Sequence, residues 1–123
     1  MASFTKELSE VDAKKQMAIP TNFVEHLPSH GGGNTQYIPV VDVDGKVWRF
    51  GYYIRGENSP YPKPVFQGEW HQFAKAKKLV AGDQITFRIE TDAAGNPRYT
   101  IAAQKPVSDK LFGHVIRGWG QEF

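Results

Sequence analysis

Cysteine is absent from the 123 residues of this sequence. Its absence excludes disulfides, Cys-ligated zinc and thiol chemistry, and it suits a reducing compartment. No apolar run approaches the roughly 20 residues that a membrane helix needs. The N-terminal residues also lack the apolar segment of a signal peptide. We therefore expect an intracellular, soluble domain.

A strong charge of one sign is also lacking, since fifteen Lys and Arg against thirteen Asp and Glu give a net charge of +2. The distribution is uneven, because residues 46–88 hold eight cationic side chains against three acidic ones. A basic surface in this region is compatible with a polyanionic partner. A solvated, lysine-bearing helix explains Lys75, Lys77 and Lys78 equally well.

Catalytic arrangements are missing too, because no Ser/His/Asp set or pair of carboxylates stands out. Gly31-Gly32-Gly33 neither follows a predicted strand nor opens a helix, which argues against a phosphate-binding loop. Pro28 separates His26 from His30 and would break the helix needed to align them on a metal. The sequence therefore indicates a protein that is not an enzyme and has no metal or cofactor.

Aromatic and β-branched residues are abundant, and 40% hydrophobic content argues against disorder. Residues 37–43 and 46–54 predict two strands. Asp44-Gly45 between them predicts a type I′ turn, which needs positive φ at both central residues. Alternation along the second strand predicts a core face formed by Trp48, Phe50, Tyr52 and Ile54.

The other predicted elements are short and are separated by turns. About six or seven strands with two short helices favour a small, mostly antiparallel barrel over a parallel α/β sheet. In the first half of the chain we expect a strand at 4–8, a polar connector at 9–16, an apolar segment at 17–19 and a helix at 21–27. After the two strands named above, we expect a polar, proline-stiffened arm at 55–64, a brief apolar piece at 65–66 and a helix at 68–78. Paired strands at 84–90 and 98–104, with Ile85, Phe87 and Ile89 inward, and a tail at 107–123 complete the prediction.

Six short motifs also occur in a fixed order. They are Phe4-x-Lys6, Ile19-Pro20, Leu27-Pro28, Asp42-x-x-Gly45-Lys46-x-Trp48-x-Phe50, Gly68-x-Trp70-x-x-Phe73 and Leu79-x-Ala81-Gly82-Asp83-x-x-x-Phe87. With this order and spacing, residues 4–105 resemble the plant B3-type DNA-binding domain. The resemblance implies a mostly β fold, a seven-stranded open pseudobarrel with two short α-helices, in a nuclear plant transcription factor. We expect a B3-type domain over residues 1–105 and a C-terminal tail over residues 106–123.

The resemblance further implies two arms that grip the major groove of double-stranded DNA, here Glu10–Met17 and Ile54–Pro64. Lys and Arg can donate to phosphates or to guanine, and Gln and Asn can contact adenine. Phosphate contacts would set affinity and register, and base contacts would specify the sequence. The candidates are Lys15, Gln16, Arg55 and Asn58 for bases, Lys6, Lys14, Arg49 and Lys63 for phosphates, and Ser9 and Ser59 for either.

The predicted tail contains Lys110-Leu111-Phe112-Gly113, which resembles the Arg/Lys-Leu-Phe-Gly-Val motif that recruits a corepressor in some proteins of this family. The alternative is an apolar tail that packs on the barrel or on a neighbouring chain. Two functions therefore stay open. The chain is either a sequence-specific duplex DNA binder that regulates transcription, or a non-catalytic interaction or dimerisation module whose arms bind DNA weakly or not at all.

Overall fold

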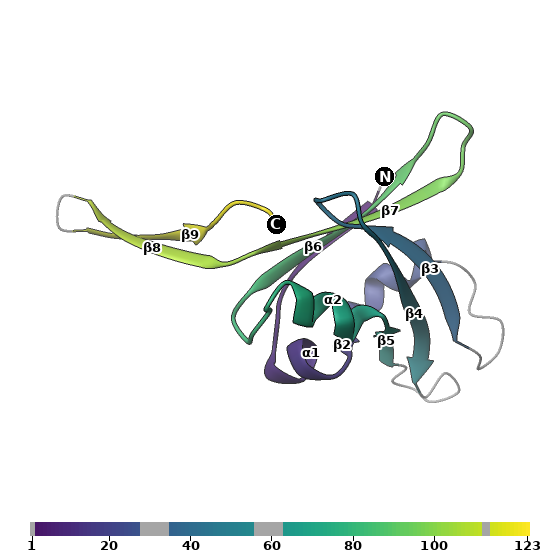
Figure 1. Ribbon diagram of the computed structural model, residues 1–123, viewed down its shortest axis with the longest axis horizontal. Helices are drawn as coiled ribbons and strands as arrows, with labels where there is room; N and C mark the ends of the chain where they lie inside the picture. Colours follow the sequence, from purple (N-terminus) through teal and green to yellow (C-terminus); the bar gives the residue numbers. More distant parts are fainter. Residues whose placement is uncertain (1, 28–34, 56–62, 112–113) are drawn as a thin grey trace.

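The computed structural model describes residues 2–27, 35–55, 63–111 and 114–123. This part of the chain is built mostly of strands (Figure 1). The elements are β1 (Ala2–Glu7), α1 (Glu10–Lys14), β2 (Met17–Ala18), η1 (Thr21–His26), β3 (Gln36–Val41), β4 (Val47–Arg55), β5 (Lys63–Gly68), α2 (Trp70–Ala76), β6 (Gln84–Thr91), β7 (Pro97–Gln104), β8 (Pro106–Leu111) and β9 (His114–Trp119).

Seven strands form one sheet in the order β1-β6-β7-β3-β4-β5-β2. Neighbouring strands are antiparallel except β3 and β7, which pair in parallel at Val40↔Tyr99 and Val41↔Thr100. The sheet curls into a half-barrel, so that its two outer strands, β1 and β2, approach each other (Figure 1). The predicted mostly β, open pseudobarrel is confirmed.

The inner face of β4 lies at the centre of the core, as its alternating pattern predicted. Trp48, Phe50 and Tyr52 are at most 5% exposed, and Ile54 packs against the same cluster. The ring of Phe50 meets Trp70 of α2 edge-on, with centroids 5.8 Å apart. This geometry is favourable for aromatic pairs and fixes α2 against the sheet. These aromatic residues belong to the core.

The prediction of a type I′ turn between β3 and β4 is wrong, because a longer turn is found there. Gly45 has φ of +84°, but Asp44 does not have a positive φ. Gly45 N donates to Asp42 O at 3.0 Å and Asp42 N donates to Lys46 O at 2.9 Å, which is a type I turn followed by a left-handed glycine. The Asp42 carboxylate accepts from the backbone N–H groups of Asp44 and Lys46, both at 2.9 Å, and so stabilises this longer turn.

The helices only partly follow the prediction. The expected polar connector at 9–16 contains a helix, α1, while the expected helix at 21–27 is the 3-10 helix η1. α2 lies within the predicted range 68–78. In the described part of the chain, no helix is long and apolar enough to cross a membrane.

The predicted tail contains regular structure. β8 and β9 form a hairpin with register from Pro106↔Trp119 to Leu111↔His114, and this hairpin projects from the half-barrel (Figure 1). The chain then returns to β7, where Phe123 and Ala103 exchange two backbone hydrogen bonds of 2.8 and 3.0 Å. The division of the chain at residue 105 stays a prediction.

Candidate nucleic-acid interface

The first predicted arm and the described ends of the second, at Arg55 and Lys63, lie on the same side of the half-barrel. Figure 1 shows α1 on one flank of this side and the junction of β4 with β5 on the other, with β2 and β5 between them. The link is direct, because β2 pairs with β5 at Met17↔Phe66 and Ala18↔Val65, and Ile19 N donates to Pro64 O at 2.9 Å. The first arm therefore leads into a strand that is hydrogen-bonded to the start of β5.

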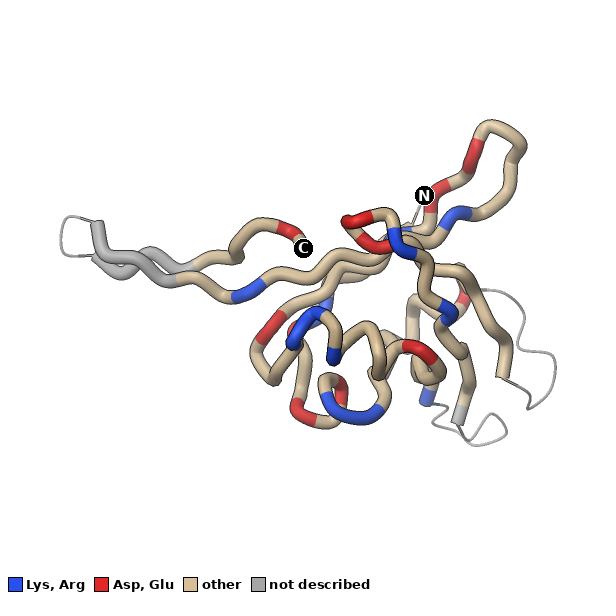
Figure 2. The backbone as a smooth tube through the Cα atoms, viewed as in Figure 1, with Lys and Arg blue, Asp and Glu red and all other residues tan. Residues whose placement is uncertain are grey.

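This side, which we call the arm face, is defined by five predicted site residues: Lys14, Lys15, Gln16, Arg55 and Lys63. Lys14, Lys15 and Lys63 are exposed and Gln16 is half-buried. Arg55 and Lys63 are opposite each other where β4 pairs with β5. Figure 2 shows Lys and Arg positions on both flanks of the arm face, with the acidic positions of α1 among them. The arm face thus presents several cations with mixed local charge.

The remaining second-arm candidates cannot be placed. Asn58 and Ser59 lie outside the described residues, as does the whole range 56–62. The same holds for Phe112 and Gly113 of the partial corepressor motif, whereas the backbones of Lys110 and Leu111 belong to β8. The roles predicted for all of these residues stay predictions.

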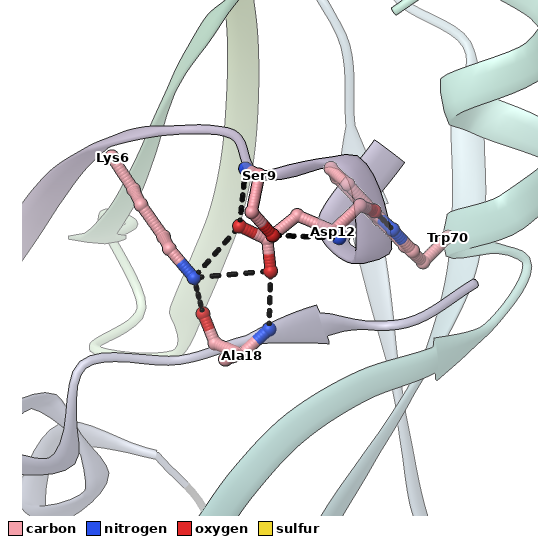
Figure 3. A network of polar contacts seen from close by, with 5 residues as sticks. All are labelled: Lys6, Ser9, Asp12, Ala18 and Trp70. Carbon is pink, nitrogen blue, oxygen red and sulfur yellow. Dashed lines mark hydrogen bonds and ion pairs between the residues drawn. The ribbon is translucent and has the colours of Figure 1, made fainter. Parts of the chain in front are cut away.

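The first arm is held by a buried carboxylate, that of Asp12, which is 3% exposed. Its oxygens accept from Ser9 N at 2.9 Å and from Ala18 N at 3.1 Å. The Lys6 ammonium lies 3.1 Å from Oδ1 and 3.0 Å from Oδ2, and it also donates to Ala18 O at 2.7 Å (Figure 3). One side chain therefore connects β1, α1 and β2.

Burial alone would raise the pKa of Asp12, because a charged carboxylate loses its hydration. The hydrogen bonds from the Ser9 backbone, Lys6 and the Ala18 backbone, with the charge of Lys6, outweigh this effect and hold the pKa below its ordinary value of 3.8. Asp12 is accordingly ionised at neutral pH, and its charge is balanced within the network.

Trp70 fixes α1 from the other side. Its indole Nε1 donates to the backbone oxygen of Asp12 at 2.8 Å, and the side chain is fully buried (Figure 3). The sequence identifies Trp70 only as part of a motif and predicts no role for Asp12. The signal for Asp12 was Ser9-x-x-Asp12, since Ser9 Oγ accepts from Asp12 N while Asp12 accepts from Ser9 N, which is a capping box.

Three residues predicted to contact DNA, Lys6, Ser9 and Arg49, do not belong to the arm face. The Lys6 side chain is 25% exposed and its ammonium takes part in the Asp12 network. Ser9 caps α1. Arg49 is exposed, its guanidinium stacks 4.3 Å above the Tyr37 ring, and it precedes Arg55 by six residues, or roughly 20 Å of strand. The structure therefore brings Lys14, Lys15 and Gln16 to the arm face with Arg55 and Lys63, and it places Arg49 apart from them.

The fold defines a class of protein, open β-pseudobarrel domains, and the arm face lies on one side of this half-barrel. The sequence model of the family described as "B3 DNA binding domain" matches residues 4–105. The chain belongs to this family, which confirms the resemblance read from its motifs. The family is a DNA-binding domain of transcription factors.

Individual relatives support the same family assignment. The chain is similar to the B3 domain-containing transcription factor NGA3 of Arabidopsis thaliana, at 32% identity over 94% of this chain and 33% of that protein. It is also similar to the AP2/ERF and B3 domain-containing transcription factor RAV1 of the same plant, at 30% identity over 97% of this chain and 35% of that protein. The chain thus spans about a third of the length of these two relatives.

Solved structures with the same fold include the Arabidopsis FUS3–DNA complex. It shares 30% identity with a TM-score of 0.69, over 83% of this chain and 95% of that chain. A hypothetical Arabidopsis thaliana protein matches with a TM-score of 0.63 at 20% identity, over 85% of this chain and 90% of that one, and supports the fold alone.

Proposed function

We propose that this chain binds double-stranded DNA sequence-specifically in the major groove, as part of a nuclear plant transcription regulator. The observation that carries the proposal is the position of the first arm beside the described ends of the second arm, Arg55 and Lys63, on one side of a B3 half-barrel. A major groove about 12 Å wide admits an α-helix or two strands, which leaves room for two such arms. The similarity to the FUS3–DNA complex supports the same use. The alternative, an interaction module whose arms have lost DNA, lacks comparable support.

The residues of the two arms divide by chemistry. We assign base contacts to Lys15, Gln16, Arg55 and Asn58, because their donors match the edges of guanine and adenine. We assign phosphate contacts to Lys14 and Lys63, which are exposed on the arm face. Arg49 would reach only a flanking phosphate, and Ser59 either kind of group.

Lys6 and Ser9 take a different part in this proposal. Their polar atoms already bond to Asp12 and to the backbone of the first arm. We therefore assign them the positioning of α1, which sets the direction of Lys14 and Lys15.

The test is a binding titration of the chain against a duplex selected from a random pool and against a mixed-sequence duplex, at several salt concentrations. If about six phosphates are neutralised, the logarithm of the association constant should fall with a slope near −5 against the logarithm of the salt concentration. Arg55→Ala should weaken the selected duplex more than the mixed one, because a base contact is sequence-dependent.

Arg98→Ala serves as the matched control, since Arg98 is exposed at the β6–β7 turn, away from the arm face. It should leave both affinities nearly unchanged. Absence of salt-sensitive duplex binding in the mixed pool would refute the proposed function. Equal losses on both duplexes for Arg55→Ala would reassign Arg55 to a phosphate.

A further inference from the structure

A shallow apolar groove runs between α1 and α2. None of the candidate base-contacting residues that the structure describes lies in this groove. It consists of two adjoining hollows of about 270 and 370 Å³ that share Ala13, Lys14, Leu79 and Val80 as lining residues. Val80 is 57% exposed, although it is an aliphatic residue next to the buried Leu79. His71, the buried Ala74, Lys75 and Lys78 complete the larger hollow, and we call the whole feature the lysine groove.

The rim of the lysine groove carries more positive than negative charge, because Lys14, Lys75 and Lys78 line it with Glu10 as the one carboxylate among the lining residues. The neighbouring Lys77 forms ion pairs with Asp42 at 3.7 Å and Asp44 at 2.8 Å. Lys75 and Lys78 are exposed, and neither pairs with a carboxylate of the described residues. Lys14, on the opposite rim, pairs only with the exposed Glu10 of its own helix, and such a pair is readily exchanged.

Lys78 occupies a backbone position that favours glycine. Its φ is +55°, and it is the only residue other than glycine with positive φ in the described part of the chain. The position ends α2, where Leu79 N donates to Ala74 O at 2.9 Å. Glycine or asparagine would adopt this conformation with less strain. A lysine here supplies an ammonium group at the rim that glycine would not.

We propose that the lysine groove binds an acidic, amphipathic segment of a partner protein. Apolar side chains of the segment would pack on the exposed Val80, while its carboxylates would pair with Lys75 and Lys78. Complementary charge around an apolar centre is the usual arrangement of a recognition site for a helical segment. The lysines alone would also attract phosphates, whereas the exposed apolar Val80 between them favours a segment with apolar side chains over a nucleic-acid strand.

The position of the lysine groove allows the segment and a duplex to bind together. Figure 1 places α1 and α2 on the flank of the half-barrel away from the β4–β5 junction. Only Lys14 belongs both to the groove and to the arm face. The inference therefore goes beyond the proposed DNA contacts and does not depend on them.

The probe is a fluorescein-labelled peptide of about 15 residues, or four helical turns, with leucines at i, i+4, i+7 and i+11 and glutamates elsewhere on its flanks. A peptide of the same composition in scrambled order is its control. Fluorescence anisotropy measures binding to the full chain, alone and saturated with duplex. The amphipathic peptide should bind in both cases, and at least about tenfold more tightly than the scrambled one.

Two variants locate the site. Val80→Asp removes an exposed apolar contact and Lys75→Glu reverses one rim charge, and each should weaken the peptide by about tenfold. Arg98→Glu changes the net charge as much as Lys75→Glu does, at the far β6–β7 turn, and should change binding less than about twofold. Circular dichroism and thermal unfolding of each variant check that the fold is retained.

Three results would overturn the proposal. One is no binding of the amphipathic peptide to the full chain, and another is equal binding of both peptides, which would reflect net charge alone. The third is a loss of duplex affinity in Lys75→Glu as large as its loss of peptide affinity, which would make the lysine groove part of the DNA-contacting surface.

Discussion

At the scale of single residues, Asp12 determines the position of the first arm without being available to a ligand. Its carboxylate accepts from Lys6 of β1, from the backbone of Ser9 and from the backbone of Ala18 in β2. A buried charge is costly unless it is paired and hydrogen-bonded, and here both conditions hold. This one side chain therefore bonds to β1, to the residue before α1 and to β2, and so holds the first arm in position.

Asp12→Asn should lower the free energy of unfolding at pH 7 by about 1–3 kcal/mol, because an amide cannot pair with Lys6 and accept both backbone N–H groups. The pKa of Asp12 is depressed in the folded state, so its stabilising effect is full above its ordinary pKa of 3.8 and is lost as the pH falls below that value. Urea unfolding between pH 7 and pH 3 should show the difference between the native chain and the variant shrinking toward the acid end.

Asp92→Asn is the control for this prediction. Asp92 accepts from the backbone N–H groups of Ala94 and Asn96, both at 2.9 Å, but it is exposed in the β6–β7 turn. Its replacement should cost clearly less. A difference for Asp12→Asn that stays constant down to pH 3 would show that its ionisation does not contribute to stability.

The residues that sequence reasoning could and could not identify differ in a physical way. Lys14, Lys15 and Lys63 were predicted because exposed cations follow from residue type and from the resemblance. Asp12 was missed because an aspartate in a polar stretch is normally solvated, and only the folded chain brings Lys6 and Ala18 to it. The positioning residues of the candidate site thus depend on contacts between distant parts of the chain.

At the scale of elements, length decided which ones were predictable. β4 has nine residues and α2 has seven, enough for an alternating pattern and for one helical apolar face. α1 has only five residues, too few for a helical period to appear, and an isolated helix of that length would be unstable in water. It persists because Ser9 and Asp12 cap it and Trp70 bonds to its backbone.

The end of α2 offers a test at this scale. Lys78→Gly should raise the free energy of unfolding by about 1 kcal/mol, because glycine adopts the left-handed conformation of φ +55° without a steric penalty. Chemical denaturation at neutral pH measures the change. Lys75→Gly, inside the last turn of the helix, is the matched control and should destabilise by about 1 kcal/mol.

The expected changes in stability for Lys78→Gly and Lys75→Gly do not depend on the proposed peptide site. A destabilising effect of Lys78→Gly would mean that the lysine side chain contributes contacts that outweigh the strain. Lys78→Gly should also weaken binding of the amphipathic peptide, because it removes one ammonium group from the lysine groove.

At the scale of the whole molecule, the C-terminal residues pair with the part of β7 that extends beyond its pairing with β3. β7 pairs with β3 only at Tyr99 and Thr100, and beyond them Phe123 bonds to Ala103. Phe123 also packs against the core cluster. This return could not be predicted from residue patterns, because it depends on a hairpin that reverses the chain between residues 106 and 119.

A chain ending at Lys105 should unfold with a free energy lower by about 2–3 kcal/mol, from three lost backbone hydrogen bonds, at Ala103 and Lys105, and the lost apolar contact of Phe123. Urea denaturation compares it with the full chain. The control replaces residues 108–117 by Asn-Gly, a two-residue hairpin turn, and keeps Gly120–Phe123. It should stay near native stability. Equal stability of the shortened and full chains would show that residues 106–123 are dispensable for folding.

The pairing of β2 with β5 fixes the end of the first arm relative to the start of β5, where the second arm ends. The distance between these two points cannot change without breaking the hydrogen bonds at Ala18↔Val65 and between Ile19 and Pro64. In the proposed complex, the duplex must therefore supply any adjustment of groove width. Because the cost of deforming DNA depends on its base sequence, base pairs that no side chain touches would then influence which sites are bound.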